Sequence, residues 1–351
     1  MASHPGVARP SLAQSYLEFA ANHLRRAWDR YVRGLRYDFV YSPGINCFDA
    51  DVIFVRIVFA EFLRQAGDEL AWSRVPLRDW PRLLHRKLYY RLIVALERRI
   101  YSDPKTMLVL YAKKTARDLE RFYGRRDRLP VLYLGLDDAT FNPARRAVLR
   151  EGARRELGLA VDQFAGFLVG NDLRKKGIAV LFEAMGKMGD LPVRLLLAGR
   201  EDPAPFEAMA RAAGVAERVQ FLPARKDVEF YHAAADAYAG PSLEDTFALP
   251  PAEAMACGLP VIVSAENGTC EIVSHDEDGM ILNDAADAES LASVIRTLCQ
   301  DPAVRAHLGE KAAEIARQYT WERNGHDLAL IFEDVMPRKA QSSGHTLPQQ
   351  S

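Results

Sequence analysis

The sequence lacks an apolar run long enough to cross a bilayer, and its first residues have no apolar core of the signal-peptide kind. Cysteine is scarce: the four cysteines among 351 residues form neither a metal-ligand spacing nor a disulfide framework. No G-x-G-x-x-G motif, P-loop or serine nucleophile elbow occurs. These absences exclude the common nucleotide-motif and disulfide-rich classes and favour a reduced, cytoplasmic setting.

Signatures of a metal site are missing as well. The eight histidines are scattered, and none pairs with Cys, Asp or Glu at a metal-ligand spacing. Asp49-Ala50-Asp51 has the spelling of an Asp-x-Asp motif, but it falls in the N-terminal half of the chain. We therefore expect no metal ion and no other cofactor.

The net charge of −1 conceals two oppositely charged halves. Residues 1–150 contain 27 Lys+Arg and 16 Asp+Glu, a net charge of +11. Of the chain's 46 basic and 47 acidic residues, 19 and 31 remain for the rest, a net charge of −12. A basic half indicates an anionic partner, such as a membrane surface, nucleic acid or acidic substrate, or else a charge match between two facing domains.

Predicted strands alternate with predicted helices along the chain, which is typical of α/β domains with parallel sheets. The N-terminal half predicts a helix at 11–34 and strands at 37–41, 51–56, 106–111 and 130–134. The second half predicts six strands, at 164–170, 193–198, 219–222, 237–240, 260–263 and 280–282. Six strands in that rhythm make a complete doubly wound domain. We predict domains at 1–143 and 144–320, a closing helix at 321–336 and a disordered polar tail at 337–351.

The most informative stretch runs from Pro241 to Ser264. Asp245 and Glu253 flank a turn that leads into a helix opened by Pro250-Pro251. A helix N-terminus offers N–H groups and the positive end of the helix dipole to a phosphate, and carboxylates accept hydrogen bonds from hydroxyls. The stretch indicates a nucleotide-sugar pocket, and a helix with an acidic first turn is the plainer alternative.

This stretch resembles the signature of the family 4 glycosyltransferases, retaining enzymes of the GT-B fold, in which two Rossmann-like doubly wound domains face a cleft. Their signature has an acid, seven residues and a Glu around a Phe-x-Leu core, then Glu-Ala-Met-Ala-x-Gly-x-Pro-Val. Asp245 and Glu253 match that frame, with Asp in place of the usual Glu, and Glu244 falls one position outside it. The resemblance implies that Asp245 holds donor-sugar hydroxyls and Glu253 the ribose hydroxyls. The turn beside the donor comprises Thr246, Phe247, Ala248 and Leu249.

A basic loop follows the predicted strand 164–170. Gly170 ends that strand, and Arg174, Lys175 and Lys176 come next; cations at this edge of a sheet can neutralise a diphosphate. A solvated basic turn is the alternative. The resemblance, here to lipopolysaccharide core glucosyltransferases in particular, implies Lys176 as a diphosphate ligand and catalytic residue beside Asp245 and Glu253. Arg174 or Lys175 would supply the second charge.

Two weaker signals follow other predicted strands. Gly199 ends the strand at 193–198, and its family counterpart lies near the nucleotide, although a plain turn also explains a lone glycine. Asn267 and Gly268 could form an anion-accepting turn. Glu271, in a segment that resembles the family's Gly-x-x-Glu-Ile-Val, would then lie near a ribose or pack at the domain interface.

A long basic helix is predicted at 80–101. Lying flat on an anionic membrane, it would bury its apolar side and extend its cations toward lipid headgroups. The alternative is a core helix with a charged outer face.

The resemblance covers roughly residues 35–336. It implies a retaining hexosyltransferase that moves a sugar from a nucleotide-diphosphate donor to a glycan or lipid-linked acceptor in bacterial surface polysaccharide synthesis. No nucleic acid is expected as a partner, and the predicted location is cytoplasmic or peripheral on the inner face of the plasma membrane. The family's leading strand and Gly-rich loop have no counterpart, so we expect a truncated first domain. The alternative function is a non-catalytic or partner-dependent nucleotide-sugar-binding protein of the GT-B fold.

Overall fold

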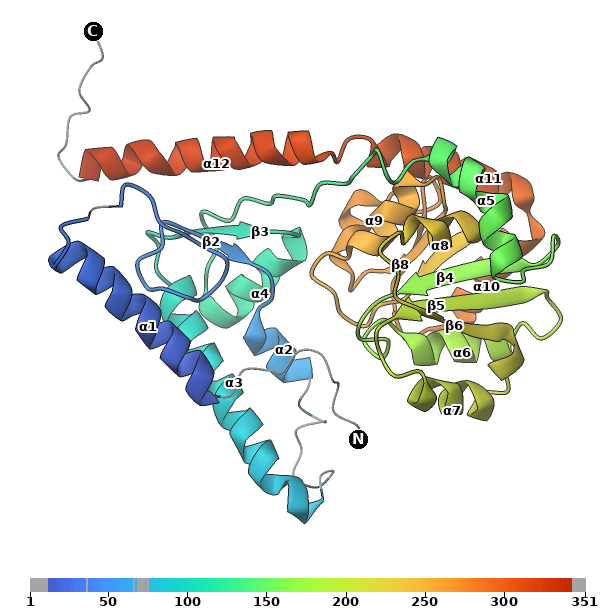
Figure 1. Ribbon diagram of the computed structural model, residues 1–351, viewed down its shortest axis with the longest axis horizontal. Coiled ribbons are helices and arrows are strands. Elements are labelled where there is room, and N and C mark those ends of the chain that lie inside the picture. Colours follow the sequence, from blue (N-terminus) through green and yellow to red (C-terminus); the bar gives the residue numbers. More distant parts are fainter. Residues whose placement is uncertain (1–11, 36, 66, 68–72, 74–75, 343–351) are drawn as a thin grey trace, which may run out of the picture. The chain divides into compact units, whose positions relative to one another are not determined.

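The computed structural model describes residues 12–35, 37–65, 67, 73 and 76–342, which form two compact units (Figure 1). The first unit comprises Met1–Tyr133 and Gly325–Ser351, and the second comprises Leu134–Asn324. The predicted junction followed residue 143, whereas these units divide after Tyr133. The last helix, α12 (Trp321–Ser342), includes the predicted closing helix and continues beyond residue 336. The rest of the predicted tail, 343–351, lies outside the described residues.

The first unit is built around a parallel three-stranded sheet in the order β1-β2-β3. Its strands are β1 (Tyr41–Ser42), β2 (Val52–Val55) and β3 (Met107–Leu110). Its helices before α12 are α1 (Leu12–Tyr31), α2 (Phe59–Gln65), η2 (Leu77–Asp79), α3 (Trp80–Tyr101) and α4 (Lys113–Tyr123). The strand predicted at 37–41 begins only at Tyr41. The strand predicted at 130–134 is reduced to one bridge between Leu110 and Val131, so both expectations were too long.

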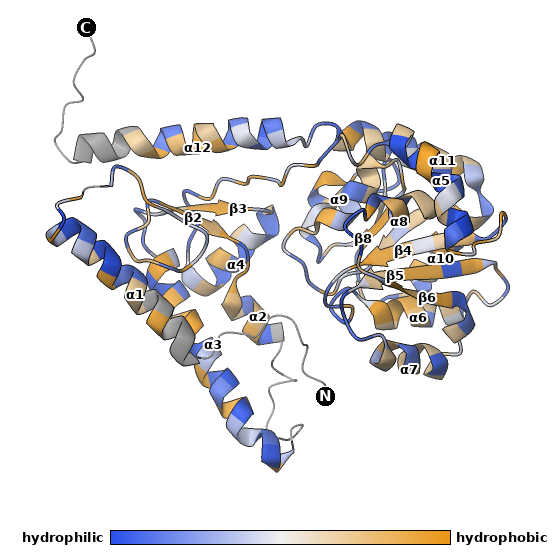
Figure 2. Ribbon diagram, viewed as in Figure 1, coloured by the Kyte–Doolittle hydropathy of each residue, from blue (hydrophilic) through white to orange (hydrophobic). Residues whose placement is uncertain are grey.

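Strands β2 and β3 are buried on both faces, which explains their unbroken apolar sequences, VIFV and MLVL. Alternate residues point to opposite faces. Ile53 and Leu108 pack in a cluster with Leu119 of α4, whereas Phe54 packs with Val335 of α12. In Figure 2 both strands carry the hydrophobic colour. Helices therefore cover both faces of this small sheet.

The second unit holds a parallel six-stranded sheet in the order β6-β5-β4-β7-β8-β9. The six predicted strands are confirmed as β4 (Phe164–Val169), β5 (Val193–Gly199), β6 (Val219–Pro223), β7 (Ala237–Gly240), β8 (Val261–Ser264) and β9 (Met280–Leu282). The other elements are α5 (Pro143–Glu156), α6 (Ile178–Gly186), α7 (Ala204–Ala212), η3 (Ala216–Arg218), α8 (Glu229–Ala234), α9 (Leu249–Ala256), η4 (Gly268–Ile272), α10 (Ala288–Gln300) and α11 (Pro302–Ala316). Strand order reverses between β4 and β7. Open α/β sheets bind ligands at the carboxyl ends of the strands beside such a switch.

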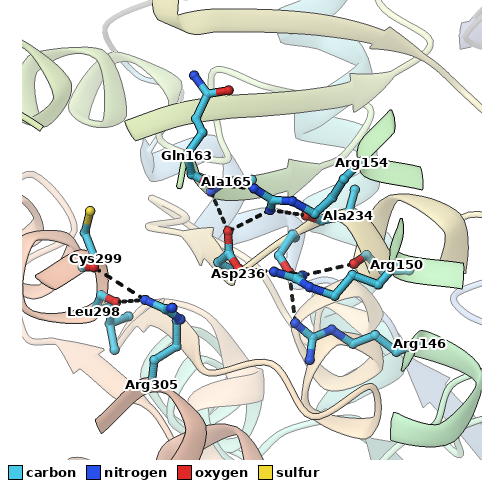
Figure 3. Close-up of polar contacts among 12 residues, drawn as sticks. Arg146, Arg150, Arg154, Gln163, Ala165, Ala234, Asp236, Leu298, Cys299 and Arg305 are labelled. Atoms are coloured by element: carbon cyan, nitrogen blue, oxygen red, sulfur yellow. Dashed lines mark hydrogen bonds and ion pairs between the residues drawn. The ribbon is translucent and has the colours of Figure 1, made fainter. Parts of the chain in front are cut away.

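A row of arginines on α5 fastens α8 to the sheet (Figure 3). Arg146, Arg150 and Arg154, spaced four residues apart, donate to carbonyl oxygens at the end of α8, which no helical N–H satisfies. Arg150 and Arg154 also pair with the buried Asp236, at 2.5 and 3.0 Å. The same carboxylate accepts a hydrogen bond from the amide of Ala165 at the start of β4. Burial lowers the pKa of the Arg146 guanidinium to about 10.

Candidate functional site

Two loops meet at the carboxyl ends of the central strands β4 and β7. The amide of Leu243, after β7, donates to the carbonyl of Lys175, after β4, at 2.7 Å. Gly177 has a φ of +82°, and a Cβ there would overlap the carbonyl oxygen of Pro241. A Cβ on Gly199 would overlap the carbonyl oxygen of Gly170. Glycine is therefore required at both positions because the backbones approach so closely.

Two ion pairs join these loops. Lys176 Nζ lies 2.5 Å from the carboxylate of Asp245, and Lys175 Nζ lies 3.8 Å from that of Glu244. The side chains of Lys176 and Asp245 are 14% and 22% exposed, so they lie at the surface of the second unit rather than in its core. The structure thus brings together the cation that the sequence assigned to the diphosphate and the acid that it assigned to the sugar.

Glu253 lies one turn into α9, with its side chain 19% exposed. The neighbouring Tyr238 is fully buried, and this burial raises the pKa of its phenol; the charges of Asp245 and Glu253 raise the same pKa further. Both carboxylates therefore act on one buried ring at the end of β7. The three residues predicted to be catalytic converge on this part of the second unit.

The turn between Asp245 and α9 is held from the loop after β8. Phe247 and Ala248 are buried. The hydroxyl of Thr269 donates to the carbonyl of Ala248 at 2.6 Å and accepts from the amide of Ala248 at 3.0 Å. Thr246 is half-buried at the start of this turn, and Leu249 opens the helix. Sequence reasoning did not assign Thr269, and only its place after the Asn-Gly pair could have indicated a turn-supporting role.

The expectation of an anion-accepting turn at Asn267 and Gly268 is wrong. The amide of Gly268 donates to the carbonyl of Asp245, and the side chain of Asn267 accepts from the amide of Thr269. The amide of Gly268 instead fixes the backbone of Asp245, whose own amide donates to the backbone carbonyl of Glu266. Glu271 lies further along, half-buried in η4.

The N-terminus of α9 offers fewer donors than the sequence suggested. Pro250 and Pro251 occupy its first turn and have no N–H, and the amide of Ala248 is bonded to Thr269. The dipole remains, but an anion bound here would depend mainly on side-chain cations. Lys175 and Arg174 were the two candidates for the second positive charge. Lys175 pairs with Glu244, whereas the guanidinium of Arg174 lies over the ring of Phe206, 5.7 Å from its centre.

In the described part of the chain, no group of three or more His, Cys, Asp or Glu residues is placed to hold a metal ion. The absence of a cofactor stays a prediction. No described helix is long and apolar enough to cross a membrane.

Comparisons with known proteins bear on the family and on the fold. Residues 150–315 match the family described as glycosyl transferases group 1. The chain is 32% identical over 242 residues to the D-inositol 3-phosphate glycosyltransferase of Xylanimonas cellulosilytica; the match covers 66% of this chain and 58% of that protein. The chain thus spans less than two thirds of the length of this relative.

Two solved structures share the fold. One is WaaG, a glycosyltransferase involved in lipopolysaccharide biosynthesis, with a TM-score of 0.73, 24% identity and coverage of 92% of this chain and 85% of WaaG. The other is Anabaena HepE in complex with UDP-glucose, with a TM-score of 0.68, 20% identity and coverage of 90% and 81%. The second unit thus matches the glycosyl transferases group 1 family over residues 150–315, and the chain has the GT-B fold.

Proposed function

We propose that this protein is a retaining hexosyltransferase. Its donor is a nucleoside diphosphate sugar bound by the second unit. Its acceptor is a glycan or lipid-linked intermediate of bacterial surface polysaccharide synthesis. The observation that carries the proposal is the ion pair between Lys176 and Asp245. It places a cation beside a carboxylate that can accept hydrogen bonds from sugar hydroxyls, at the point where the strand order reverses.

This ion pair defines how a donor would bind. Without a donor, the ammonium of Lys176 and the carboxylate of Asp245 compensate each other's charge. A diphosphate carries more negative charge than one carboxylate, so it draws Lys176 away and leaves Asp245 to accept hydrogen bonds from the sugar. Lys175 supplies the second charge from the same loop. The lysines, without a metal ion, then stabilise the negative charge that develops on the departing diphosphate.

Glu253 completes the donor site by accepting hydrogen bonds from the ribose hydroxyls. The sugar is transferred with retention of configuration, and the departing phosphate helps to remove the proton of the acceptor hydroxyl on the same face. The complex of HepE with UDP-glucose supports a donor of this class. The lipopolysaccharide role of WaaG supports a glycan or lipid-linked acceptor.

A nucleotide-sugar-binding protein without transferase activity is the second candidate. It is favoured by the small first sheet, which has three strands in the described residues against six in the second unit. An acceptor site built on that unit would have fewer strand ends to carry it.

The two candidates are separated by incubating the full chain with a panel of UDP-, GDP- and ADP-sugars and measuring donor hydrolysis and melting temperature. Slow hydrolysis that is lost in Lys176→Ala and Glu253→Ala supports the transferase. Lys311→Ala, which removes a cation from an exposed pair on α11, should leave hydrolysis unchanged. Binding without hydrolysis supports the second candidate, and a panel in which no nucleotide raises the melting temperature refutes both.

We propose further that the first unit contacts an anionic membrane surface. Helix α1 docks through its polar side: Arg26 pairs with Asp49 at 2.7 Å, and Asp29 accepts from Tyr37 at 2.9 Å. Its apolar residues lie on the opposite side of the helix and are exposed; Leu24 is 71% and Tyr31 81% exposed. An amphipathic helix that turns its apolar side outward suits a lipid interface.

Helix α3 carries a second set of exposed apolar residues. Its inner side packs in the unit through Leu83 and Ile93, so the alternative of a core helix is confirmed for that side. Trp80, Leu84 and Leu88, spaced four residues apart, remain exposed on another side. Exposed arginines at 82, 91, 98 and 99 accompany them. This mixture of apolar and cationic side chains supports attachment to anionic lipid.

Flotation of the full chain with liposomes tests this contact. Vesicles that contain phosphatidylglycerol should carry the protein upward, and vesicles of phosphatidylcholine alone or high salt should release it. Leu24→Ser with Trp28→Ser should weaken flotation. Val148→Ser on α5, an equally exposed apolar position of the second unit, is the matched control. Binding that is indifferent to salt and to lipid charge contradicts the proposal.

A further inference from the structure

His232 of α8 is a buried polar side chain with no hydrogen-bond partner. The residue is completely buried, and within the described structure neither Nδ1 nor Nε2 has a partner. Leaving such a group unsatisfied destabilises the folded state. Buried polar atoms are almost always paired, so a ring with two orphaned nitrogens requires an explanation.

One polar group lies within short reach of this ring. Nε2 of His232 lies 3.8 Å from a carboxylate oxygen of Glu253, which is beyond hydrogen-bonding distance by about 1 Å. Glu253 is partly exposed and can move, whereas the histidine ring is enclosed. The other close neighbours of the His232 ring are aromatic. The distances between ring centres are 5.0 Å to Phe167, 5.7 Å to Phe141 and 6.5 Å to Tyr238, which is stacked on the imidazole.

The helix that carries His232 is held firmly. Immediately after it, the carbonyl oxygens at the end of α8 accept hydrogen bonds from the α5 arginines, and Asp236 pairs with Arg150 and Arg154 (Figure 3). At the start of α8, Glu229 pairs with Arg145 at 2.8 Å. Salt bridges therefore hold both ends of this short helix. The imidazole of His232 is fixed in place, whereas the partly exposed carboxylate of Glu253 can move toward it.

We propose that His232 is a positioning residue for Glu253. A small shift of Glu253 lets the ring donate its Nε2–H to the carboxylate from the buried side, already in the free protein. The ribose hydroxyls then bind the carboxylate from the open side. Glu253 then has one orientation, in which its remaining lone pairs meet the two hydroxyls of the ribose. This inference rests on the proposed role of Glu253 in binding a nucleoside diphosphate. It adds that selection of a ribose depends on a histidine that does not touch the ligand.

A double-mutant cycle in the full chain tests the inference by calorimetry with UDP, GDP and ADP, each compared with its 2′,3′-dideoxy form. For the nucleotide that binds, His232→Phe should weaken the ribonucleotide about tenfold, the loss of roughly one charge-assisted hydrogen bond. The effect should fall below about twofold for the dideoxy form and in the Glu253→Gln background. His232→Gln, which keeps a donor, should recover part of the affinity. Equal weakening in both backgrounds, or of both nucleotide forms, would show a merely structural role and overturn the inference.

A second measurement does not depend on nucleotide. The ¹⁵N resonances of the His232 ring in the free protein should report a protonated Nε2 and should shift in Glu253→Gln. They should not shift in Glu266→Gln, which changes an exposed carboxylate after β8. If no nucleotide binds but these shifts occur, the proposed function fails and the pairing of His232 with Glu253 stands. If a nucleotide binds and the ring does not sense Glu253, the inference fails alone.

Discussion

At the scale of single residues, removal of one charge from the Lys176–Asp245 ion pair should have the clearest effect on ligand binding. In the proposed function, a diphosphate competes with Asp245 for Lys176, and the donor sugar competes with Lys176 for Asp245. Substitution of one partner should therefore affect nucleotide binding and sugar transfer differently.

Asp245→Asn should tighten the binding of a free nucleoside diphosphate by up to about fivefold, because partly exposed pairs contribute roughly 0.2–1 kcal/mol that the ligand must overcome. The same variant should lose donor hydrolysis, since Asn binds the sugar less strongly than a carboxylate. Lys176→Met should weaken both. Calorimetry and a hydrolysis assay provide the readouts, with Lys311→Ala as control. Weaker nucleotide binding by Asp245→Asn would contradict the competition.

Glu97 of α3 is a second residue with a measurable effect, in the first unit. Its carboxylate accepts from the amides of Phe59 and Ala60 at the start of α2 and from the hydroxyl of Tyr123 at 2.6 Å. Burial nevertheless raises its pKa from 4.5 to about 7. Burial of the charge outweighs these hydrogen bonds, which favour it.

The stability of this unit should therefore fall as pH rises. Between pH 4.5 and 7 the folded state binds a proton at Glu97 that the unfolded state has released, so rising pH favours unfolding. The loss is complete above pH 7 and amounts to roughly 3 kcal/mol. Urea unfolding at pH 5 and pH 8 should show it in the wild type and not in Glu97→Gln. An identical pH dependence in both proteins would exclude Glu97 as its source.

Among the elements, α8 depends most on contacts from distant sequence. It has six residues, too few for an isolated helix to be stable, and its last carbonyls are satisfied by arginines of α5. The orientation of His232 therefore depends on this row.

Asp236→Asn should lower the free energy of unfolding by about 3–5 kcal/mol, because it leaves Arg150 and Arg154 without their buried counter-ion. Glu151→Gln is the matched control: Glu151 pairs with Arg155 on the outer side of α5, and its removal should cost less than about 1 kcal/mol. Chemical denaturation of the three proteins measures both values. Similar losses of unfolding free energy in the two variants would show that burial of Asp236 does not strengthen its ion pairs with the α5 arginines.

The molecule as a whole consists of two compact units with separate sheets. Such units can unfold independently. All the groups assigned to the donor lie in Leu134–Asn324, so a nucleotide should stabilise only that unit.

Calorimetry should therefore resolve two transitions, of which one moves upward with nucleoside diphosphate. At a concentration one hundred times the Kd, the gain is about 2.7 kcal/mol, or roughly 5–10 °C for a unit of this size. Lys176→Met should remove the shift without altering the other transition. Equal shifts of both transitions would show that the units respond as one.

Much of the fold followed from local pattern. The six strands of the second unit are short apolar runs bounded by glycine or proline, and the backbone confirms each within a few residues. The first unit was predicted less well, because the stretches at 37–41 and 130–134 have strand composition but little pairing in the described structure. Composition indicates a strand, whereas hydrogen-bonding partners decide its length.

The sequence by itself determined the α/β architecture, the donor motif and the two acids around the turn, because periodicity and the spacing of Asp245 and Glu253 are properties of neighbouring residues. Only the tertiary structure decided which groups meet. The sheet order brings Lys176 to Asp245 across 69 positions of sequence, turns the apolar side of α1 outward, and sets His232 behind Glu253. Each of these depends on which strand ends adjoin and which helix face docks, and those choices minimise the energy of the whole chain rather than of any segment.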